Sequence, residues 1–399
     1  MNARQFPLLL LVIATVSSAA VEINLKVTNP NKKFVANAPV VIQLQNLKNI
    51  SSNERSQLAV YVDNKQISSQ LDDLNKDGIQ DELVFLLDLK GKETRKVVIK
   101  TIPDSERQKF PPEVYADLIL KTKDGEWQYL NEISSSKNDM YNKLHHHGVA
   151  FESALIGYRI YFDNKSTVDI YGKKKYRLEL PDTEWYPTSE QIAAGYGDDV
   201  LRVLQTVGVG TVKGFTNGHT VHIDKFDKRT QRIVALGNLR AVVEWEVEGW
   251  EYEGEKINIT ARYILYARHR DVAVEVRASE NINQLATGVQ RIDAGSLFSN
   301  NKGLVGSWGA DYPVDDTIHY EKQTCGLGVY VPKKYVLHHQ IDDANNLVIM
   351  QYLKNDVLCF HFLAVAVTKE EENKIHSDKE FFTFLKQWSL NLKPVQVKF

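Results

Sequence analysis

The chain has 399 residues, of which 43% are hydrophobic and 25% are charged. Its 49 Lys and Arg residues nearly balance its 51 Asp and Glu residues, which excludes the basic excess typical of nucleic-acid-binding proteins and polybasic membrane anchors. The apolar content and the 18 Tyr, 15 Phe and 6 Trp residues exclude intrinsic disorder. A large, soluble, aromatic-rich globular protein remains.

Residues 1–20 form a predicted secretory signal peptide. Arg4 supplies its positive flank, an apolar run follows, and Ser18 and Ala20 are the small residues that precede a cleavage site. The apolar run is too short to span a bilayer as a mature helix. We therefore expect a periplasmic or secreted protein with no membrane span after cleavage.

Short runs of β-branched and aromatic residues, separated by turn residues, predict an all-β fold. The predicted strands are 21–27, 40–44, 58–62, 96–100, 241–247, 257–266, 272–277, 328–331 and 357–367. A proline-rich polar stretch at 101–112 divides them. We expect a small N-terminal β-sandwich over 21–103 and a large sheet-on-sheet unit over 104–399.

An acidic loop within the small sandwich resembles a calcium-binding loop. Loop positions one, three, five and nine hold Asp73, Asn75, Asp77 and Asp81. Gly78 occupies position six, where calcium loops turn sharply, but Val84 replaces the usual bidentate Glu at position twelve. Glu82 is a candidate substitute. The alternative is a solvated turn whose Asp and Asn side chains bind their own backbone.

The segment 145–173 is the main candidate for catalysis. His145, His146 and His147 lead into a strand, and a hairpin follows around the turn 163–166. Alternation along the strands predicts one apolar face and one functionalised face. The functionalised face carries Arg159, Tyr161, Asp163, Asp169, Tyr171 and Lys173.

Two simpler interpretations of this segment stay open. Cross-strand ion pairs are normal on a solvated sheet face. The histidines, with Glu152 nearby, are also potential metal ligands. Neighbouring side chains of an extended strand point apart, so only His145 and His147 are expected to share a face.

Several later residues are candidates for substrate binding. Trp185, Tyr186, Tyr196 and Trp308 lie in Gly- or Pro-punctuated stretches that predict loops, where aromatic rings stack on sugars or simply anchor the loop. Asp199 is a further candidate for substrate binding. Near the C-terminus, residues 379–390 show the period of a helix that packs on a sheet. Cys325 and Cys359 are compatible with either a disulfide or two buried thiols.

The motifs HHHGVAFES, YRIYFDN, DIYGK and DDLNKDGIQDELVF resemble a secreted bacterial family catalogued as a domain of unknown function, number four-eight-six-one. The similarity continues through most of the mature chain, whereas His219 and His338–His339 depart from it. The resemblance implies a β-supersandwich like that of mutarotase-like proteins and several polysaccharide lyases. It also implies processing of oligosaccharides or polysaccharides that contain uronic acid.

The chemistry of the segment is compatible with β-elimination by a lyase or a dehydratase. Arg159 or Lys173 can neutralise a uronate carboxylate, because cations bind carboxylates through charge-assisted hydrogen bonds. A neutral histidine among His145–His147 can act as the base. Tyr161 or Tyr171 can then protonate the leaving oxygen.

Other functions remain open from the sequence. A glycoside hydrolase needs two carboxylates about 5 Å apart for retention or about 6.5–9.5 Å apart for inversion. Glu152, Asp169 and Asp199 are the candidates. A non-catalytic sugar-binding protein and a mutarotase are further alternatives.

Overall fold

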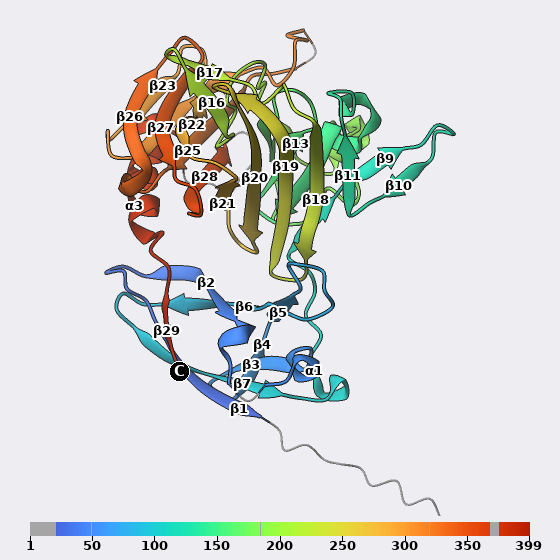
Figure 1. Ribbon diagram of the computed structural model, residues 1–399, viewed down its shortest axis with the longest axis vertical. Coiled ribbons are helices and arrows are strands. Elements are labelled where there is room, and N and C mark those ends of the chain that lie inside the picture. Colours follow the sequence, from blue (N-terminus) through green and yellow to red (C-terminus); the bar gives the residue numbers. More distant parts are fainter. Residues whose placement is uncertain (1–20, 49, 184, 319, 368–374) are drawn as a thin grey trace, which may run out of the picture.

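The computed structural model describes residues 21–48, 50–183, 185–318, 320–367 and 375–399 (Figure 1). The predicted signal peptide lies outside these residues. Each predicted strand overlaps a strand of the structure, and the predicted all-β fold is confirmed. The two largest hydrophobic cores of the described residues lie in a small sandwich and in a larger unit.

The small sandwich consists of two antiparallel sheets. The first, in spatial order, contains β29 (Gln396–Lys398), β1 (Glu22–Thr28), β7 (Thr94–Thr101), β3 (Leu58–Val62) and β4 (Lys65–Ile67). The second contains β2 (Val35–Gln43), β6 (Glu82–Leu89) and β5 (Ser69–Asp72). Strand β29 returns from the far end of the chain to pair with β1, a long-range pairing that the sequence analysis did not predict.

A nine-stranded antiparallel sheet runs across the larger unit (Figure 1). Its strands, in spatial order, are β11 (Glu132–Ser135), β18 (Lys228–Leu236), β19 (Arg240–Tyr252), β20 (Glu255–Tyr266), β21 (Asp271–Ala278), β28 (Leu358–Ala366), β25 (Gln323–Tyr330), β24 (Leu304–Asp311) and β23 (Ser296–Ser299). The inward side chains of β20 and β21 alternate with partly exposed ones, as expected of a sheet with one buried face, whereas β19 is buried at most positions.

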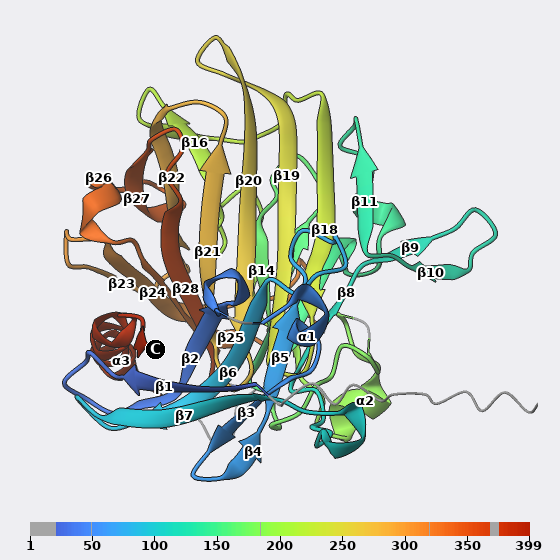
Figure 2. The same ribbon diagram turned by 60° about the horizontal axis from the view of Figure 1, so that its bottom comes forward.

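Two five-stranded sheets complete the larger unit. One contains β15 (Asp198–Asp199), β14 (Val168–Gly172), β13 (Ile156–Tyr161), β12 (Gly148–Ser153) and β8 (Val114–Asp117). The other contains β17 (His219–Val221), β16 (Lys213–Thr216), β22 (Ile282–Gln290), β27 (Asn345–Tyr352) and β26 (Val336–Ile341). A separate hairpin of β9 (Ile119–Lys121) and β10 (Trp127–Tyr129) projects from the side of the unit (Figures 1 and 2).

Helices are few and short. They are α1 (Ser52–Arg55), α2 (Ser189–Ala193), α3 (Asp378–Asn391) and the 3₁₀ turns η1 (Leu44–Asn46), η2 (Asp104–Glu106), η3 (Tyr141–Lys143), η4 (His145–His147) and η5 (Lys333–Tyr335). Helix α3 is the predicted C-terminal helix, with Ser377 as its N-cap. It packs closely on β25, where a Cβ at Gly328 would lie 2.3 Å from the side chain of Leu385.

Polar contacts fix the hairpin sheet and the small sandwich to the nine-stranded sheet. The Gln231 amide on β18 accepts from the Val149 backbone N–H at 2.9 Å and donates to the Ile160 carbonyl at 3.0 Å. At the lower end of the same sheet, Arg240 on β19 pairs with Asp72 and Glu82 of the small sandwich. These contacts connect elements that lie far apart in the sequence, and they position β12–β14.

Candidate functional site

The predicted hairpin forms from β13 and β14. Arg159 lies directly opposite Asp169 across the two strands. At the turn, the Asp163 carboxylate accepts from the backbone N–H groups of Lys165 and Ser166 at 2.8 and 3.0 Å, as is typical of an Asx turn. One face of the hairpin, including Tyr158, Ile160 and Ile170, joins the main core, in agreement with the predicted alternation.

The functionalised face is buried rather than solvated. Residues 174–183 and 185–200, which we call the covering segment, lie over it. Leu180 and Trp185 of this segment pack with Ala150 and Tyr171 in a small apolar cluster. A charged sheet face under an apolar cover must satisfy its ionic groups internally, because an unpaired buried charge is strongly unfavourable.

One buried ion pair joins the strands to the covering segment. Lys173 contacts Glu152, and both side chains are almost completely inaccessible to solvent. The second Glu152 oxygen accepts from the backbone N–H groups of Glu179 and Leu180 at 2.8 and 2.9 Å. The Tyr171 hydroxyl donates to Glu179 at 3.0 Å. Glu152, Tyr171 and Lys173 therefore hold the covering segment in place.

A second network surrounds Arg159, whose side chain is 1% exposed. Its Nη2 atom donates to Asp169 at 2.7 Å, to the Tyr161 hydroxyl at 2.6 Å and to Asp199 at 3.2 Å. The Tyr161 hydroxyl in turn donates to Asp169 at 2.6 Å. The Tyr186 hydroxyl accepts from the same Nη2 at 3.3 Å. The structure thus brings together five of the residues that the sequence analysis selected.

Aromatic rings and charge complete this network. The guanidinium carbon of Arg159 lies 4.3 Å from the centre of the Trp185 ring, a cation–π arrangement that suits a buried arginine. Burial and the negative charge of Asp169 raise the pKa of Asp199 well above its usual value. The raised pKa favours the protonated form of Asp199.

The three histidines do not share the geometry of a strand. His146 and His147 adopt left-handed backbone conformations, with φ of 56° and 62°. This turn brings the rings of His145 and His146 to within 3.9 Å of one another, close to Asp117 on β8. The expectation that only His145 and His147 share a face does not hold, because it assumed an extended backbone.

His147 points to the opposite side of this turn. Its ring stacks on Tyr141 at 3.9 Å and lies 6.2 Å from the ring of Tyr161. Its Nδ1 atom is 2.9 Å from the Tyr141 carbonyl oxygen, so Nδ1 carries the proton and Nε2 presents a lone pair. Burial lowers the pKa of His147, which favours this neutral form.

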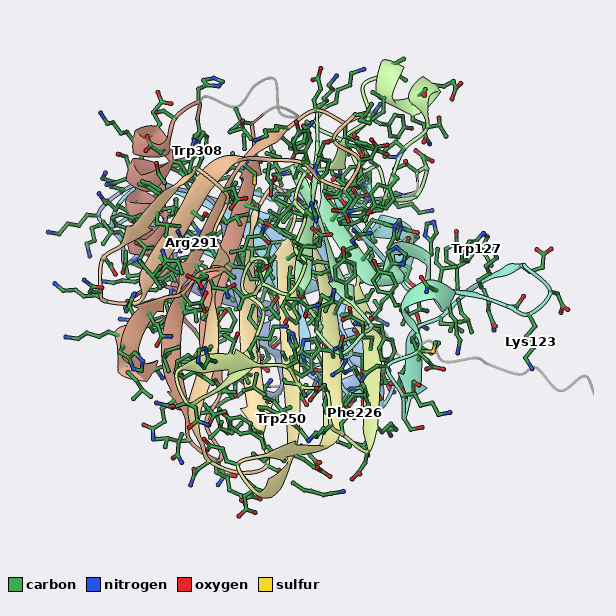
Figure 3. All side chains as sticks on the ribbon, turned by 90° about the horizontal axis from the view of Figure 1, so that it is seen from above. Lys123, Trp127, Phe226, Trp250, Arg291 and Trp308 are labelled. Carbon is green, nitrogen blue, oxygen red and sulfur yellow. The ribbon has the colours of Figure 1, made fainter. Side chains whose placement is uncertain are left out.

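The predicted aromatic residues separate into different environments. Trp185 is buried against Arg159, whereas Tyr186 is 41% exposed beside it. Tyr196 packs on the guanidinium of Arg177 at 3.8 Å. Trp308 lies in strand β24 rather than in a loop, where it packs against α3, at the opposite end of the larger unit from Trp127 (Figure 3).

The acidic loop of the small sandwich satisfies most of its own polar atoms. Asp73 accepts from the Gly78 backbone N–H at 2.8 Å, and Asp81 accepts from the Leu74 backbone N–H at 2.7 Å. Gly78 has φ of 87°, which suits glycine at the sharp turn. Glu82 contacts Arg240 and Gln43, so we remove it from the predicted ligand set. Calcium binding by Asp73, Asn75, Asp77 and Asp81 stays a prediction.

Residues 27–397 match the family profile described as DUF4861, a domain of unknown function. The chain belongs to the DUF4861 family. The family suggested by the sequence motifs is therefore confirmed over residues 27–397.

Other comparisons show only distant likeness. No curated protein sequence matches the DUF4861 chain significantly. A glycosyl hydrolase family 38 protein from Enterococcus faecalis superimposes with a TM-score of 0.45 and 9% identity, over 94% of this chain and 47% of that one. An alpha-mannosidase from the same organism gives 0.45 and 9%, over 94% and 46%. The chain thus spans about half the length of both structures. Within the described residues, no helix is long and apolar enough to cross a membrane.

Three buried polar residues near the site were missed from the sequence. Asp117 ends an edge strand about 30 residues before the histidines. Glu179 belongs to the covering segment. Lys213 on β16 is 1% exposed and bonds to the Lys165 carbonyl in the hairpin turn. Lys213 could have been found from the sequence, because it is a charged residue within an apolar run. Asp117 and Glu179 have no distinctive local pattern.

The structure decides between a disulfide and two free thiols at the two cysteines. Cys325 is buried in β25 and Cys359 is half-buried in β28, and both are free thiols. Cys325 lies opposite Ala366, whereas Cys359 lies opposite Glu275. Burial raises the pKa of Cys359 to about 11, so this thiol is a poor nucleophile.

Calcium binding is tested by thermal melting. We expect calcium at about 5 mM, above the dissociation constants of most extracellular calcium sites, to raise the melting temperature of the wild-type protein by a few degrees. Asp77→Ala should abolish this increase, whereas Asp124→Ala in the β9–β10 loop should retain it. A wild-type melting temperature that does not respond to calcium would exclude the site.

The pH dependence of stability tests the buried lysine. Burial lowers the pKa of Lys213 to about 7, far below that of an unfolded lysine. Between these two values the unfolded chain binds the extra proton, so stability gains a contribution that rises from pH 7 to pH 10. Lys213→Met should show a smaller rise than the wild type in melting temperature over this range. An equal rise of melting temperature with pH in the two proteins would contradict the lowered pKa of Lys213.

Proposed function

We propose that this protein is a secreted carbohydrate-processing enzyme that performs β-elimination on uronic-acid-containing oligosaccharides. The observation that carries the proposal is the orientation of His147, whose Nδ1 is fixed by the Tyr141 carbonyl at 2.9 Å so that Nε2 is the free base. The family resemblance supports the carbohydrate class of the substrate. The signal peptide supports action in the periplasm or outside the cell.

The reacting groups lie on the rim of the Arg159 network. Arg159, Asp169 and Tyr161 are occupied with one another, and Lys173 is paired with Glu152. By contrast, His147 is only partly buried and Tyr186 is 41% exposed. We therefore expect the substrate to contact these more exposed side chains, while the buried charges hold those side chains in position. Arg159 is a positioning residue in this account.

Tyr186 is the best-placed acid. Its hydroxyl oxygen accepts from Arg159, and among the described residues this hydroxyl donates no hydrogen bond. Tyr161, in contrast, already donates its proton to Asp169, and Tyr171 donates to Glu179. Burial, together with Asp199, raises the pKa of Tyr186, so its hydroxyl keeps its proton until a leaving oxygen takes it.

Lys165 is the cation available for the substrate carboxylate. Its side chain is 19% exposed, and its ammonium nitrogen lies 3.5 Å from the Asp163 carboxylate and 5.7 Å from the centre of the Tyr161 ring. Arg159 and Lys173, which the sequence analysis selected for this role, are both enclosed in ion pairs. An ammonium group at the rim can neutralise the carboxylate and make the adjacent C5 proton more acidic.

The elimination then follows from these three positions. Nε2 of His147 takes the C5 proton, and the released electron pair forms the C4–C5 double bond. The bond from C4 to its oxygen breaks, and that oxygen takes the proton of Tyr186. A leaving sugar makes the enzyme a lyase, and leaving water makes it a dehydratase. Proton exchange with solvent restores both side chains.

A second candidate function is glycoside hydrolysis by Asp169 and Asp199. Both carboxylates accept from the same nitrogen of Arg159, and the raised pKa of Asp199 favours the protonated form that a general acid needs. Both are, however, almost fully buried, at 0% and 2% exposure. Elimination is therefore the better supported reaction.

The proposal is tested by incubating the mature protein with oligosaccharides that contain glucuronic, iduronic or galacturonic acid. Elimination conjugates the new double bond with the carboxylate, so we expect new ultraviolet absorbance, with product masses that distinguish loss of water from chain scission. Products that gain water without new absorbance would indicate the hydrolase. Binding without any product would indicate a sugar-binding protein.

Single substitutions test the assigned residues. His147→Ala and Tyr186→Phe should each lower kcat by about 10²–10⁴-fold, the usual contribution of general acid–base catalysis. His219→Ala, an exposed histidine on β17, is the control and should retain full turnover. Normal kcat in both site variants would contradict the assigned roles even if the reaction itself is elimination.

A further inference from the structure

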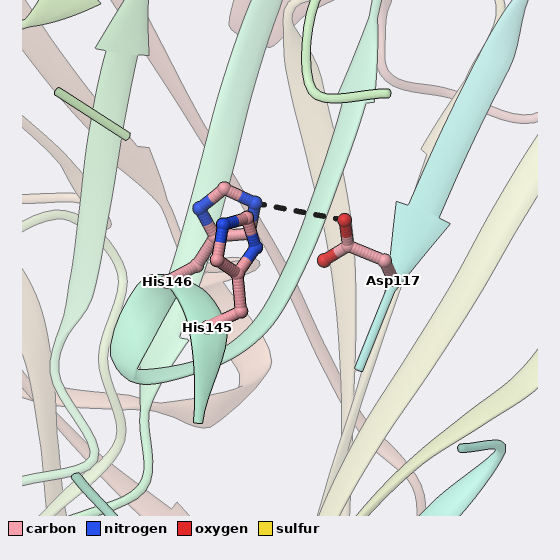
Figure 4. Close-up of side chains that lie close together, drawn as sticks. All are labelled: Asp117, His145 and His146. Carbon is pink, nitrogen blue, oxygen red and sulfur yellow. Dashed lines mark ion pairs between the residues drawn. The ribbon is translucent and has the colours of Figure 1, made fainter. Parts of the chain in front are cut away.

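A second polar cluster lies beside the candidate site, on the other side of the histidine turn. Asp117, His145 and His146 each offer one ligand atom, and these atoms lie within 4.8 Å of one another (Figure 4). Nε2 of His146 and Oδ2 of Asp117 are 3.5 Å apart. None of these three residues takes part in the proposed elimination.

The buried members of this cluster lack hydrogen-bond partners. The side chains of His146 and Asp117 are 0% and 2% exposed. Both oxygens of Asp117 and both ring nitrogens of His146 have no hydrogen-bond partner within the described residues. Buried polar groups in folded proteins are normally satisfied, so a carboxylate and an imidazole left in this state indicate a group that binds between them.

The types and spacing of the ligands point to a transition metal. Imidazole and carboxylate together suit Zn²⁺, which binds nitrogen at about 2.0–2.1 Å and oxygen at about 2.0–2.2 Å. Ligand atoms of a tetrahedral zinc site are then about 3.4 Å apart, close to the separation of the His146 and Asp117 atoms. His145 is half-buried, so its ring can move the short distance needed to complete the set.

The backbone also supports a built site. Two successive residues other than glycine in the left-handed conformation are rare, because this conformation is unfavourable for L-amino acids. Here His146 and His147 adopt them together. Such strain persists only where the surrounding contacts require it, and a bound metal at His145 and His146 would supply that requirement.

We propose that Asp117, His145 and His146 bind one Zn²⁺ ion. Three protein ligands leave a fourth coordination position, and the half-exposed His145 marks the side from which water reaches it. The metal fixes the turn that also presents His147, but its binding does not depend on the nature of the reaction at the Arg159 network.

The test measures metal binding directly on the mature protein without a histidine tag. About 1 mM calcium is included to occupy the oxygen ligands of the Asp73 loop. We expect one Zn²⁺ per chain by elemental analysis, and a visible absorption spectrum of tetrahedral Co²⁺ after substitution. Zinc should also raise the melting temperature, because it binds only the folded chain.

Three variants and one control test which residues bind the Zn²⁺ ion. Asp117→Asn, His146→Gln and His145→Ala should each weaken Zn²⁺ binding by at least about tenfold, since even the loss of an indirect partner has effects of this size. His145 is half-buried, so His145→Ala is expected to fold even if the others do not. His219→Ala should bind Zn²⁺ normally. A wild-type protein that binds no Zn²⁺, or variants that bind as tightly as the wild type, would overturn the proposal.

Discussion

The guanidinium of Arg159 brings a full positive charge to a position where its side chain is 1% exposed. A charge that is removed from water must be paired, and truncating one partner of a buried pair typically costs about 3–5 kcal/mol. Asp169 pairs with Arg159 from the opposite strand, and Asp199 from the end of the covering segment. The same contacts that satisfy the charge therefore attach the covering segment to the hairpin.

This requirement also decides which groups remain free for chemistry. The central side chains of the network, including Tyr161 and Asp169, direct their hydrogen bonds at one another. Around them, His147 keeps a lone pair on Nε2 and Tyr186 keeps its proton, while the partly exposed Lys165 lies 3.5 Å from the Asp163 carboxylate. The buried side chains are paired with one another, and the reactive side chains surround them. The charged residues that stand out in the sequence are therefore positioning residues in our account.

The sequence predicted those features that depend on local periodicity. Alternation along two short strands predicted the functionalised face of the hairpin, and helical spacing predicted α3. The features that it did not predict depend on long-range contacts or on unusual backbone geometry. No local pattern indicates that β29 pairs with β1 or that Trp308 meets α3 inside a strand. The left-handed turn at His146 likewise reversed the expected pairing of the histidines and made Asp117 their neighbour.

Hydrogen–deuterium exchange on an Arg159→Met variant tests the central claim most directly. If the Arg159 network holds the covering segment, amides of residues 185–200 should exchange much faster in the variant than in the wild type, while the separate core of the small sandwich keeps its protection. Arg95→Met, which removes only a surface ion pair with Asp63, is the matched control and should leave residues 185–200 unchanged. Unchanged protection of residues 185–200 in a folded Arg159→Met protein would contradict the account.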